Sequence, residues 1–366
     1  MSDCIIIGGG LIGMLTAREL AVAGLSVTLL DRGAAGREAS WAGGGILSPL
    51  YPWRYADAVT RLAQWSQARY ESLCDGLRED SGVDPQWTCS GLLFLDTDER
   101  AEAAEWARRF GIGLDTLDAA AVAECEPALA SPPAGLWMPQ VAQVRNPRLV
   151  RALRGSIAFH GVRIEEGVEV TAVATDGSRV VGVETRDGRL SAPRVVVAGG
   201  AWSARLLHGL GVSLAVEPVR GQMILFAARP GLVHRIVLRG GRYLIPRRDG
   251  RVLAGSTLEY VGFDKGTTKA ALEELRAAAV ALAPALADCP VEHHWAGLRP
   301  GCADGVPFVG AVTGIEGLYV NTGHFRNGVV LGPGSARLLA DLVLGREPLL
   351  DPAPYAINVL REPSQP

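Results

Sequence analysis

The first thirty-one residues contain the pattern that most limits how this chain folds. The apolar run Cys4–Ile7 predicts a buried strand and leads directly into Gly8-Gly9-Gly10-Leu11-Ile12-Gly13, which fits the spacing G-x-G-x-x-G. Helical periodicity follows over residues 11–23, and a second β-rich run, residues 26–30, ends in Asp31. A strand, a glycine turn, a helix, a strand and an acid in this order predict a dinucleotide-binding βαβ unit.

The residue types in this unit have physical reasons. Gly8 permits the tight turn, Gly10 lets the backbone approach a pyrophosphate, and Gly13 lets the helix pack closely against the strand. The helix N-terminus presents unpaired N–H groups and the positive end of its dipole to the phosphates. Asp31 is placed to accept hydrogen bonds from a ribose diol. The pattern alone does not distinguish FAD from NAD, and a turn that binds nothing is the alternative.

Length and composition narrow the class of protein. At 366 residues the chain exceeds one typical domain, so we expect two closely joined domains. Hydrophobic residues make up 48% of the sequence, which is enough to fill a large core. The formal net charge is -3 and no long run of lysines and arginines occurs, which argues against binding to nucleic acid.

The expected location is the cytoplasm. The first predicted strand begins almost at Met1 and leaves no room for a signal peptide, and no uncharged stretch is typical of a membrane span. The six cysteines are scattered without a C-x-x-C pair, so we interpret them as reduced thiols and expect no metal site. His293 and His294 have no partners at metal-binding spacing and are interpreted as structural or surface residues.

Patterns typical of parallel α/β structure lie at the two ends and in the middle of the chain, and antiparallel patterns lie between them. Asp176-Gly177, Asp187-Gly188 and Asp249-Gly250 each separate β-rich runs and predict hairpins. Periodicity predicts helices over residues 57–80 and 334–344, with a loosely held tail after the second. The alternation predicts two interleaved domains rather than two consecutive ones.

Several blocks of sequence together resemble the family of FAD flavoproteins that contains D-amino-acid oxidase and sarcosine oxidase, especially its glycine-oxidising branch. The blocks are residues 7–13, 195–203, 217–222, 295–301, 304–310 and 323–328. The last three, in this order near the C-terminus, are much more specific than the glycine turn alone. The resemblance covers most of the chain.

The resemblance implies a mixed fold class, α/β plus α+β. A Rossmann-like, glutathione-reductase-like FAD-binding domain would combine residues 1–85, 140–215 and 290–366. A substrate-binding domain on a large antiparallel sheet would be interleaved with it and comprise residues 86–139 and 216–289. Relatives on this branch also imply a homo-oligomer, in the form of a tetramer.

The resemblance places the adenosine near Asp31, Arg32 and Val170, and the flavin near residues 39–46 and 324–330. The full set of expected cofactor residues is Gly8, Gly10, Leu11, Ile12, Gly13, Asp31, Arg32, Ala39, Ser40, Gly44, Gly45, Ile46, Val170, Gly200, His324, Phe325, Arg326, Asn327, Gly328, Val329 and Val330. Relatives with covalent flavin use a cysteine where Gly297 aligns. We therefore expect non-covalent FAD, with a bond through Cys302 as the alternative.

The reaction implied by the resemblance is transfer of a hydride from the substrate Cα to flavin N5, followed by hydrolysis of the imine and reoxidation by O₂ to give H₂O₂. No protein base is obligatory, which agrees with the absence of a conspicuous His/Asp or Ser/His constellation. Such a reaction needs a clamp for the substrate carboxylate. Arg299 is the leading candidate because a guanidinium binds a carboxylate bidentately and keeps its charge, and a structural ion pair is the alternative.

Three more substrate residues rest on the resemblance. Tyr243 matches the family tyrosine that also holds the carboxylate, although a strand tyrosine is more often part of the core. Arg326 could serve the substrate, the flavin or the fold. Leu258 aligns where glycine oxidases can have a methionine that faces the small substrate.

The expected function is therefore FAD-dependent oxidative deamination of glycine and other small amines, such as sarcosine and small D-amino acids. The partners would be a small amino acid and O₂, without nucleic acid or membrane. One alternative is a flavin oxidase or dehydrogenase for another small acid, such as D-proline. Another is a non-catalytic FAD-binding subunit of a heteromeric assembly. The sequence does not choose between thiamine precursor supply and amine catabolism.

Overall fold

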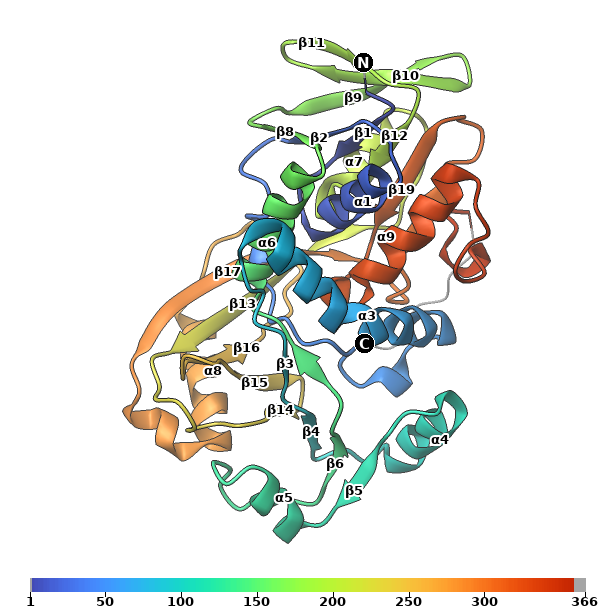
Figure 1. Ribbon diagram of the computed structural model, residues 1–366. Coiled ribbons are helices and arrows are strands. Elements are labelled where there is room, and N and C mark those ends of the chain that lie inside the picture. Colours follow the sequence, from blue (N-terminus) through green and yellow to red (C-terminus); the bar gives the residue numbers. More distant parts are fainter. Residues whose placement is uncertain (1, 359–366) are drawn as a thin grey trace.

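The structure, a computed structural model, describes residues 2–358 and contains two large β-sheets (Figure 1). The first has six strands. Five of them run parallel in the order β19 (Leu318–Thr322), β12 (Val195–Val197), β1 (Cys4–Ile7), β2 (Val27–Asp31) and β8 (Arg163–Glu166), and β18 (Phe308–Ala311) joins β19 antiparallel. This sheet occupies the upper part of the view in Figure 1.

Helices cover one face of the six-stranded sheet and a small sheet covers the other. The helices are α1 (Leu11–Val22), α3 (Asp57–Ser81), α6 (Asn146–Phe159) and α9 (Gly328–Leu344). The small sheet consists of β9 (Val170–Asp176), β10 (Arg179–Thr185) and β11 (Gly188–Ser191), next to α7 (Ser203–His208). Strand alternation sorts the side chains, since Ile6 packs with the helices while Ile5 and Ile7 pack in the cluster on the other face.

The second large sheet has eight strands and lies below the first in Figure 1. Its order is β17 (Val291–Gly301), β13 (Glu217–Phe226), β16 (Val252–Gly255), β15 (Arg242–Pro246), β14 (Ile236–Arg239), β4 (Leu92–Leu95), β6 (Gly135–Met138) and β5 (Asp115–Leu117). All neighbouring strands are antiparallel except β14 and β4. Leu275 of α8 (Lys269–Leu282) packs in the core on one face, and Trp106 of α4 (Arg100–Phe110) in that on the other.

Short elements complete the described chain. They are the strand pair β3 (Thr88–Cys89) and β7 (Ala142–Gln143), the helices α2 (Ala39–Ala42) and α5 (Ala119–Cys125), and the 3₁₀ turns Pro52–Arg54, Gly200–Trp202, Pro284–Asp288 and Ala353–Tyr355. Helix α2 lies between the two halves of the molecule, since it contacts both α6 and β17. A Cβ added at Gly297 of β17 would lie 2.5 Å from the Ala42 Cβ.

The predicted fold class is confirmed, since one large sheet is mainly parallel and the other mainly antiparallel. The hairpins predicted at Asp176-Gly177, Asp187-Gly188 and Asp249-Gly250 connect β9 to β10, β10 to β11 and β15 to β16. The segmentation predicted for the domains differs from the sheets at two points. Strand β3, expected in the substrate-binding domain, pairs with β7, expected in the cofactor domain. Residues 290–366 were expected in the cofactor domain, whereas β17 pairs with β13 along its whole length in the eight-stranded sheet.

The start predicted for the C-terminal helix is wrong, because α9 begins at Gly328, six residues before residue 334, and contains Pro333. Proline has no N–H group, so the carbonyl of Val329 loses its helical donor. The hydroxyl of Tyr70 in α3 replaces that donor and lies 2.7 Å from the Val329 oxygen. A distant side chain thus permits a proline that a local pattern treats as a helix breaker.

His293 and His294 lie within β17, the first exposed and the second partly buried with its Nε2 3.0 Å from Gln222 Oε1, as expected of structural or surface residues. One other expectation needs correction. The tail is held at Tyr355, whose ring is buried and whose hydroxyl donates to the Ala58 oxygen at 2.7 Å. Residues 359–366 of the predicted tail lie outside the described residues. Within residues 2–358, no helix is long and apolar enough to cross a membrane.

Candidate active site

A cavity of about 640 Å³ lies where the two large sheets meet. Its wall combines the glycine turn after β1, the segment around α2, the ends of β12 and β19, and the loop before α9. The eight-stranded sheet contributes Met223, Tyr243 and Arg299 to the same wall. The cavity therefore brings together residues more than three hundred positions apart.

The glycine turn has the close approaches that its sequence predicts. Gly8 has φ +111°, and a Cβ there would lie 2.5 Å from the Ala198 oxygen. A Cβ at Gly13 would lie 1.9 Å from the Gly8 oxygen, so the helix could not pack this tightly with any larger residue. The N-terminal residues Leu11 and Ile12 of α1 line the cavity, and the Leu11 N–H donates to the Ser40 hydroxyl at 2.8 Å.

Asp31 lines the cavity at the end of β2. Its carboxylate accepts the N–H groups of Gly9 and Gly33, each at 2.8 Å. Burial raises the pKa of Asp31, and these two hydrogen bonds partly oppose that rise. The neighbouring Arg32 guanidinium lies over the Trp202 ring, 4.0 Å from its centroid.

The segment after α2 runs along the cavity in a conformation that requires glycine. Gly45 has φ +82°, and a Cβ there would lie 2.0 Å from the Val144 oxygen. The Arg247 guanidinium donates to the Gly44 oxygen at 2.7 Å and to the Val144 oxygen at 3.1 Å. Burial lowers the pKa of Arg247 to about 10. Arg247 was not among the predicted site residues, because its position beside the Asp249-Gly250 turn is typical of an exposed residue.

The loop before α9 presents a neutral imidazole to the cavity. His324 is 1% exposed, and burial lowers the pKa of His324 to about 3. The Ser335 hydroxyl donates to the Gly332 oxygen at 3.1 Å, so it accepts from His324 Nε2–H at 2.9 Å. This assignment leaves Nδ1 as an acceptor, for which no partner exists within residues 2–358.

Arg299 of β17 lines the opposite part of the site. Its Nη1 donates to the Thr257 oxygen at 3.1 Å and its Nη2 to the Ser256 hydroxyl at 2.7 Å. Both acceptors are neutral, and no carboxylate in residues 2–358 forms an ion pair with Arg299. Burial lowers the pKa of Arg299, and the positive charge of Arg326 lowers it further. Arg299 is thus a largely desolvated cation that lacks a counter-charge.

The surroundings of Arg299 leave room for the guanidinium and place a phenol beside it. A Cβ on Gly221 of β13 would lie 2.0 Å from Arg299 Nη1, so a larger residue here would displace the guanidinium. The Tyr243 side chain lies within hydrogen-bonding range of Arg299 and also lines the cavity. Arg326 lines the cavity as well.

Most of the predicted site residues line this one cavity. Exceptions are Gly13, which packs against Gly8, Val330, which is in the core, Asn327, which is buried nearby, and Leu258. The Leu258 side chain is 37% exposed and does not line the cavity, so its role in substrate selection stays a prediction. The roles of the lining residues are also predictions, because shared walls do not establish binding.

Several lining residues were not predicted. Trp202, Arg205 and Leu206 follow the glycines after β12, and Met223 follows Gly221 in β13. The strand that ends in Gly199-Gly200 was an available indication for the first three, since glycines after a parallel strand favour ligand approach. Met223 had no local indication. It lines the site because β13 pairs with β17, the strand that carries Arg299.

Within residues 2–358, no group of three or more His, Cys, Asp or Glu side chains could hold a metal ion. The Cys302 thiol is buried, donates to the Gly323 oxygen at 2.7 Å and does not line the cavity.

Unpartnered buried atoms test whether the cavity fits FAD. Asn321 Oδ1 and His324 Nδ1 are acceptors without a partner among residues 2–358, and both residues line the cavity. A flavin with its ribityl chain has N–H and O–H donors that such atoms need. The open helix N-terminus suits a pyrophosphate, and Asp31 suits a ribose. The residues present fit an extended FAD.

Comparisons with known proteins agree with this geometry. The family described as FAD dependent oxidoreductase matches residues 3–342. A glycine oxidase of Pseudomonas aeruginosa is 53% identical over 354 residues, which are 96% of this chain and 97% of the relative. A glycine oxidase of Pseudomonas putida is 50% identical with the same coverage. The solved structure of glycine oxidase from Geobacillus kaustophilus matches with a TM-score of 0.94 and 32% identity, and 99% of each chain is covered.

These matches extend over nearly the whole chain, well beyond the βαβ unit at its start. They confirm the family that the blocks of sequence resemble, and with it FAD as the cofactor. A nicotinamide enzyme, which the glycine turn alone left open, is excluded. The chain therefore belongs to the family of FAD-dependent oxidoreductases, with glycine oxidases among its relatives.

Proposed function

We propose that this protein catalyses the oxidative deamination of glycine and other small amines, such as sarcosine and small D-amino acids. Glycine and O₂ would give glyoxylate, ammonia and H₂O₂. The observation that supports this most is Arg299, a desolvated guanidinium on the cavity wall that has only neutral acceptors. Relatives of this chain that are named glycine oxidase support the choice of substrate.

An uncompensated cation inside a protein is unfavourable in free energy. Removing a charged group from water is costly unless an opposite charge is supplied, so an anionic ligand is favoured at Arg299. A guanidinium presents parallel N–H groups that match the two oxygens of a carboxylate. The hydroxyl of Tyr243 lies beside these N–H groups and would donate to the same carboxylate.

When FAD is bound, its flavin supplies the redox chemistry by accepting a hydride from the substrate Cα and passing electrons to O₂. The protein's part is orientation. A carboxylate held by Arg299 and Tyr243 fixes where the adjacent Cα lies. His324, whose pKa is about 3, stays neutral and is not a proton acceptor suited to neutral pH. We assign no protein base, since an amine that enters neutral needs none.

The cofactor residues keep the assignments proposed from sequence. Asp31 would bind the ribose, the N-terminus of α1 the pyrophosphate, and the region of His324 the flavin. We propose that FAD is held without a covalent bond, since the Cys302 thiol lies off the cavity wall. The discontinuous FAD-binding and substrate-binding domains are proposed likewise, with β17 assigned to the sheet of the substrate-binding part.

Peroxide release by the FAD-loaded protein tests the proposal. Glycine should produce H₂O₂ with stoichiometric glyoxylate, while a small acid without an amine, such as glycolate, should not. Turnover of D-proline or glycolate without glycine would favour the flavin enzyme for another acid. FAD binding without reduction by any small amino acid would favour the non-catalytic subunit. Each of the two outcomes would contradict the proposal.

We also propose where the enzyme is located and how it assembles. Unpaired thiols such as Cys4, Cys74 and Cys89 are typical of a reducing compartment, which supports a location in the cytoplasm. A homotetramer is proposed by resemblance, and its mass in solution would be the test.

A further inference from the structure

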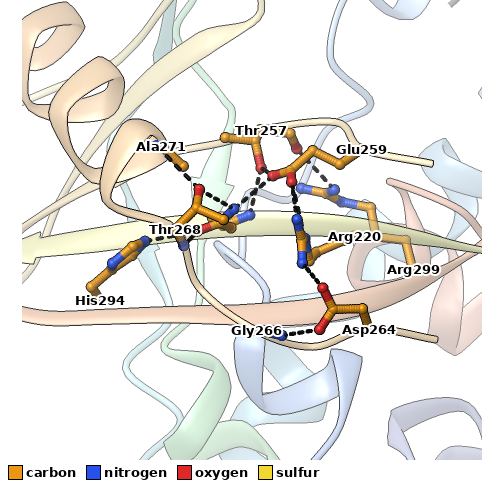
Figure 2. Close-up of polar contacts among 10 residues, drawn as sticks. Arg220, Thr257, Glu259, Asp264, Gly266, Thr268, Ala271, His294 and Arg299 are labelled. Carbon is orange, nitrogen blue, oxygen red and sulfur yellow. Dashed lines mark hydrogen bonds and ion pairs between the residues drawn. The ribbon is translucent and has the colours of Figure 1, made fainter. Parts of the chain in front are cut away.

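A network of polar side chains lies behind Arg299, on the side away from the cavity. Figure 2 shows Arg220 between the carboxylates of Glu259 and Asp264, and Thr257 between Glu259 and Arg299. Neither Arg220 nor Glu259 lines the cavity, so neither would touch a substrate there. The network contacts the cavity residue Arg299 through the Thr257 carbonyl.

Glu259 is the centre of the network. Its Oε2 accepts from Arg220 Nε at 3.0 Å and Nη2 at 2.5 Å, and its Oε1 accepts from Gln222 Nε2 at 2.8 Å. The hydroxyl of Thr257 donates to the same Oε1. Burial raises the pKa of Glu259, but the hydrogen bonds from Thr257, Arg220 and Gln222 outweigh it and hold that pKa below its usual value. The carboxylate stays ionised at neutral pH.

Thr257 transmits the position of Glu259 to Arg299. Its hydroxyl accepts the Gln222 backbone N–H at 2.9 Å and donates to Glu259, so both of its hydrogen-bonding roles are used. Its own N–H donates to the Gln222 oxygen at 3.3 Å. With its side chain and N–H both tied, the Thr257 carbonyl has a fixed direction, and this carbonyl accepts from Arg299 Nη1.

Arg220 keeps the charge of Glu259 occupied. The Arg220 side chain is 6% exposed, and its Nη1 also donates to Asp264 at 2.5 Å. Backbone hydrogen bonds between Arg220 and Glu259, at 2.9 and 3.0 Å, hold the two residues opposite each other. Because Glu259 is already paired with Arg220, the nearby Arg299 is left without an internal carboxylate. Arg299 therefore stays available to an external one.

We propose that Glu259 and Arg220 are positioning residues for Arg299. Their ion pair fixes Thr257, whose carbonyl holds the Arg299 guanidinium toward the cavity, and it keeps Glu259 from competing for that guanidinium. This inference rests on the proposed role of Arg299 as the clamp for a substrate carboxylate.

The first test replaces Glu259. Glu259→Ala removes the group that ties Thr257, and the KM for glycine should rise about tenfold while kcat changes by less than about threefold. Glu259→Gln retains an acceptor for Thr257 and should have the smaller effect on KM. The matched control is Glu292→Ala. Glu292 lies on β17, as Arg299 does, but its ion pair with Arg251 is away from the network. The control should leave KM unchanged.

The second test uses a pair of variants to separate positioning from simple loss of stability. Arg220→Met frees the charge of Glu259 for Arg299, so KM should rise more than in Glu259→Gln. Adding Glu259→Gln to Arg220→Met should then lower KM again, because the competing charge is gone. A purely structural role predicts a double variant no better than Arg220→Met. If Arg220→Met does not fold, Arg220→Lys, which keeps the charge, should lie close to the parent protein.

Binding of glycolate, followed by the change in flavin absorption, distinguishes the failure of this inference from that of the proposed function. Glycolate carries the carboxylate without the amine, so Glu259→Ala should raise its Kd by the same factor as the KM for glycine. A parent protein that neither oxidises glycine nor binds glycolate would contradict the proposed function. An active parent in which Glu259→Ala behaves like Glu292→Ala would overturn the inference alone.

Discussion

At the scale of single residues, Arg299 has the strongest chemical constraint in the described structure. Its hydrogen bonds go to the Thr257 oxygen and the Ser256 hydroxyl, neither of which balances its charge. Other arginines in the eight-stranded sheet are different, since Arg242 pairs with Glu274 and Arg220 with Glu259. Among the arginines in the strands of this sheet, Arg299 is therefore the one that lines the cavity and suits an external anion.

Removal of the Arg299 guanidinium tests this reading. Arg299→Ala should raise the KM for glycine by the equivalent of about 2–4 kcal/mol, because one charge-assisted clamp is lost. The flavin absorption spectrum should stay intact, and steady-state kinetics with spectra of the purified protein would measure both. Arg251→Ala is the control. A normal KM in Arg299→Ala would show that Arg299 does not hold the substrate carboxylate.

Gly221 gives an independent test that leaves Arg299 in place. A methyl group at this position would lie 2.0 Å from Arg299 Nη1. The end of a flexible side chain can move aside, so Gly221→Ala should fold and bind FAD yet raise KM about as much as a clamp variant. Gly113→Ala meets no atom within 4 Å and serves as the control. Equal KM values in the two variants would contradict the arrangement.

His324 predicts a pH dependence of stability. The fold lowers its pKa from 6.5 to about 3, so between these values the unfolded chain holds the extra proton. Stability from this group is full above about pH 6.5 and is lost as the pH falls toward 3, by up to about 1.4 kcal/mol per pH unit. Chemical denaturation of the FAD-loaded protein at several pH values should show a shallower acid slope for His324→Gln. An equal acid slope in the parent protein and in His324→Gln would mean that His324 is exposed to water in the folded state.

At the scale of elements, α9 shows how distant residues decide a local structure. Its first turns carry Pro333, and the carbonyl left without a donor accepts from Tyr70, 259 residues earlier in the chain. The same stretch connects to the cavity, since Val329 lines it. The position of the helix start therefore depends on α3.

Tyr70→Phe tests this dependence. Loss of the hydroxyl leaves the Val329 carbonyl unpaired in the core, which should cost about 1–3 kcal/mol of folding free energy. Denaturant unfolding would measure the loss. Tyr319→Phe is the control, in strand β19 next to α9. If Tyr70→Phe were as stable as the parent, another donor would have to serve the helix.

At the scale of the whole molecule, the features that the residue patterns predict without the family resemblance are mostly local ones. The glycine turn, the hairpins at Asp-Gly pairs and the periodic helix of residues 57–80 depend on neighbours a few positions away. The start of α9, the burial of Tyr355 and the network behind Arg299 were not predicted. Each depends on a contact between segments far apart in the chain, and Arg220 with Glu259 is such a pair.

The two halves of the molecule meet at the cavity, which explains why one reaction needs both. The six-stranded sheet contributes the turn and Asp31 that suit a dinucleotide, and the eight-stranded sheet contributes Arg299 and Tyr243 that suit a carboxylate. The segment between β16 and α8 ties the halves together, since Lys265 pairs with Glu38 at 3.0 Å. Substrate and cofactor would thus be held by opposite walls.

Anaerobic reduction of the bound flavin tests the central claim most directly. The FAD-loaded protein would be mixed, without O₂, with glycine, sarcosine, D-alanine, D-proline and glycolate in turn. Glycine, sarcosine and D-alanine should bleach the flavin absorption, and Arg299→Ala should shift this bleaching to much higher substrate concentration. Glycolate should not bleach it. A flavin that glycine leaves oxidised, while glycolate or no small acid at all reduces it, would contradict the account.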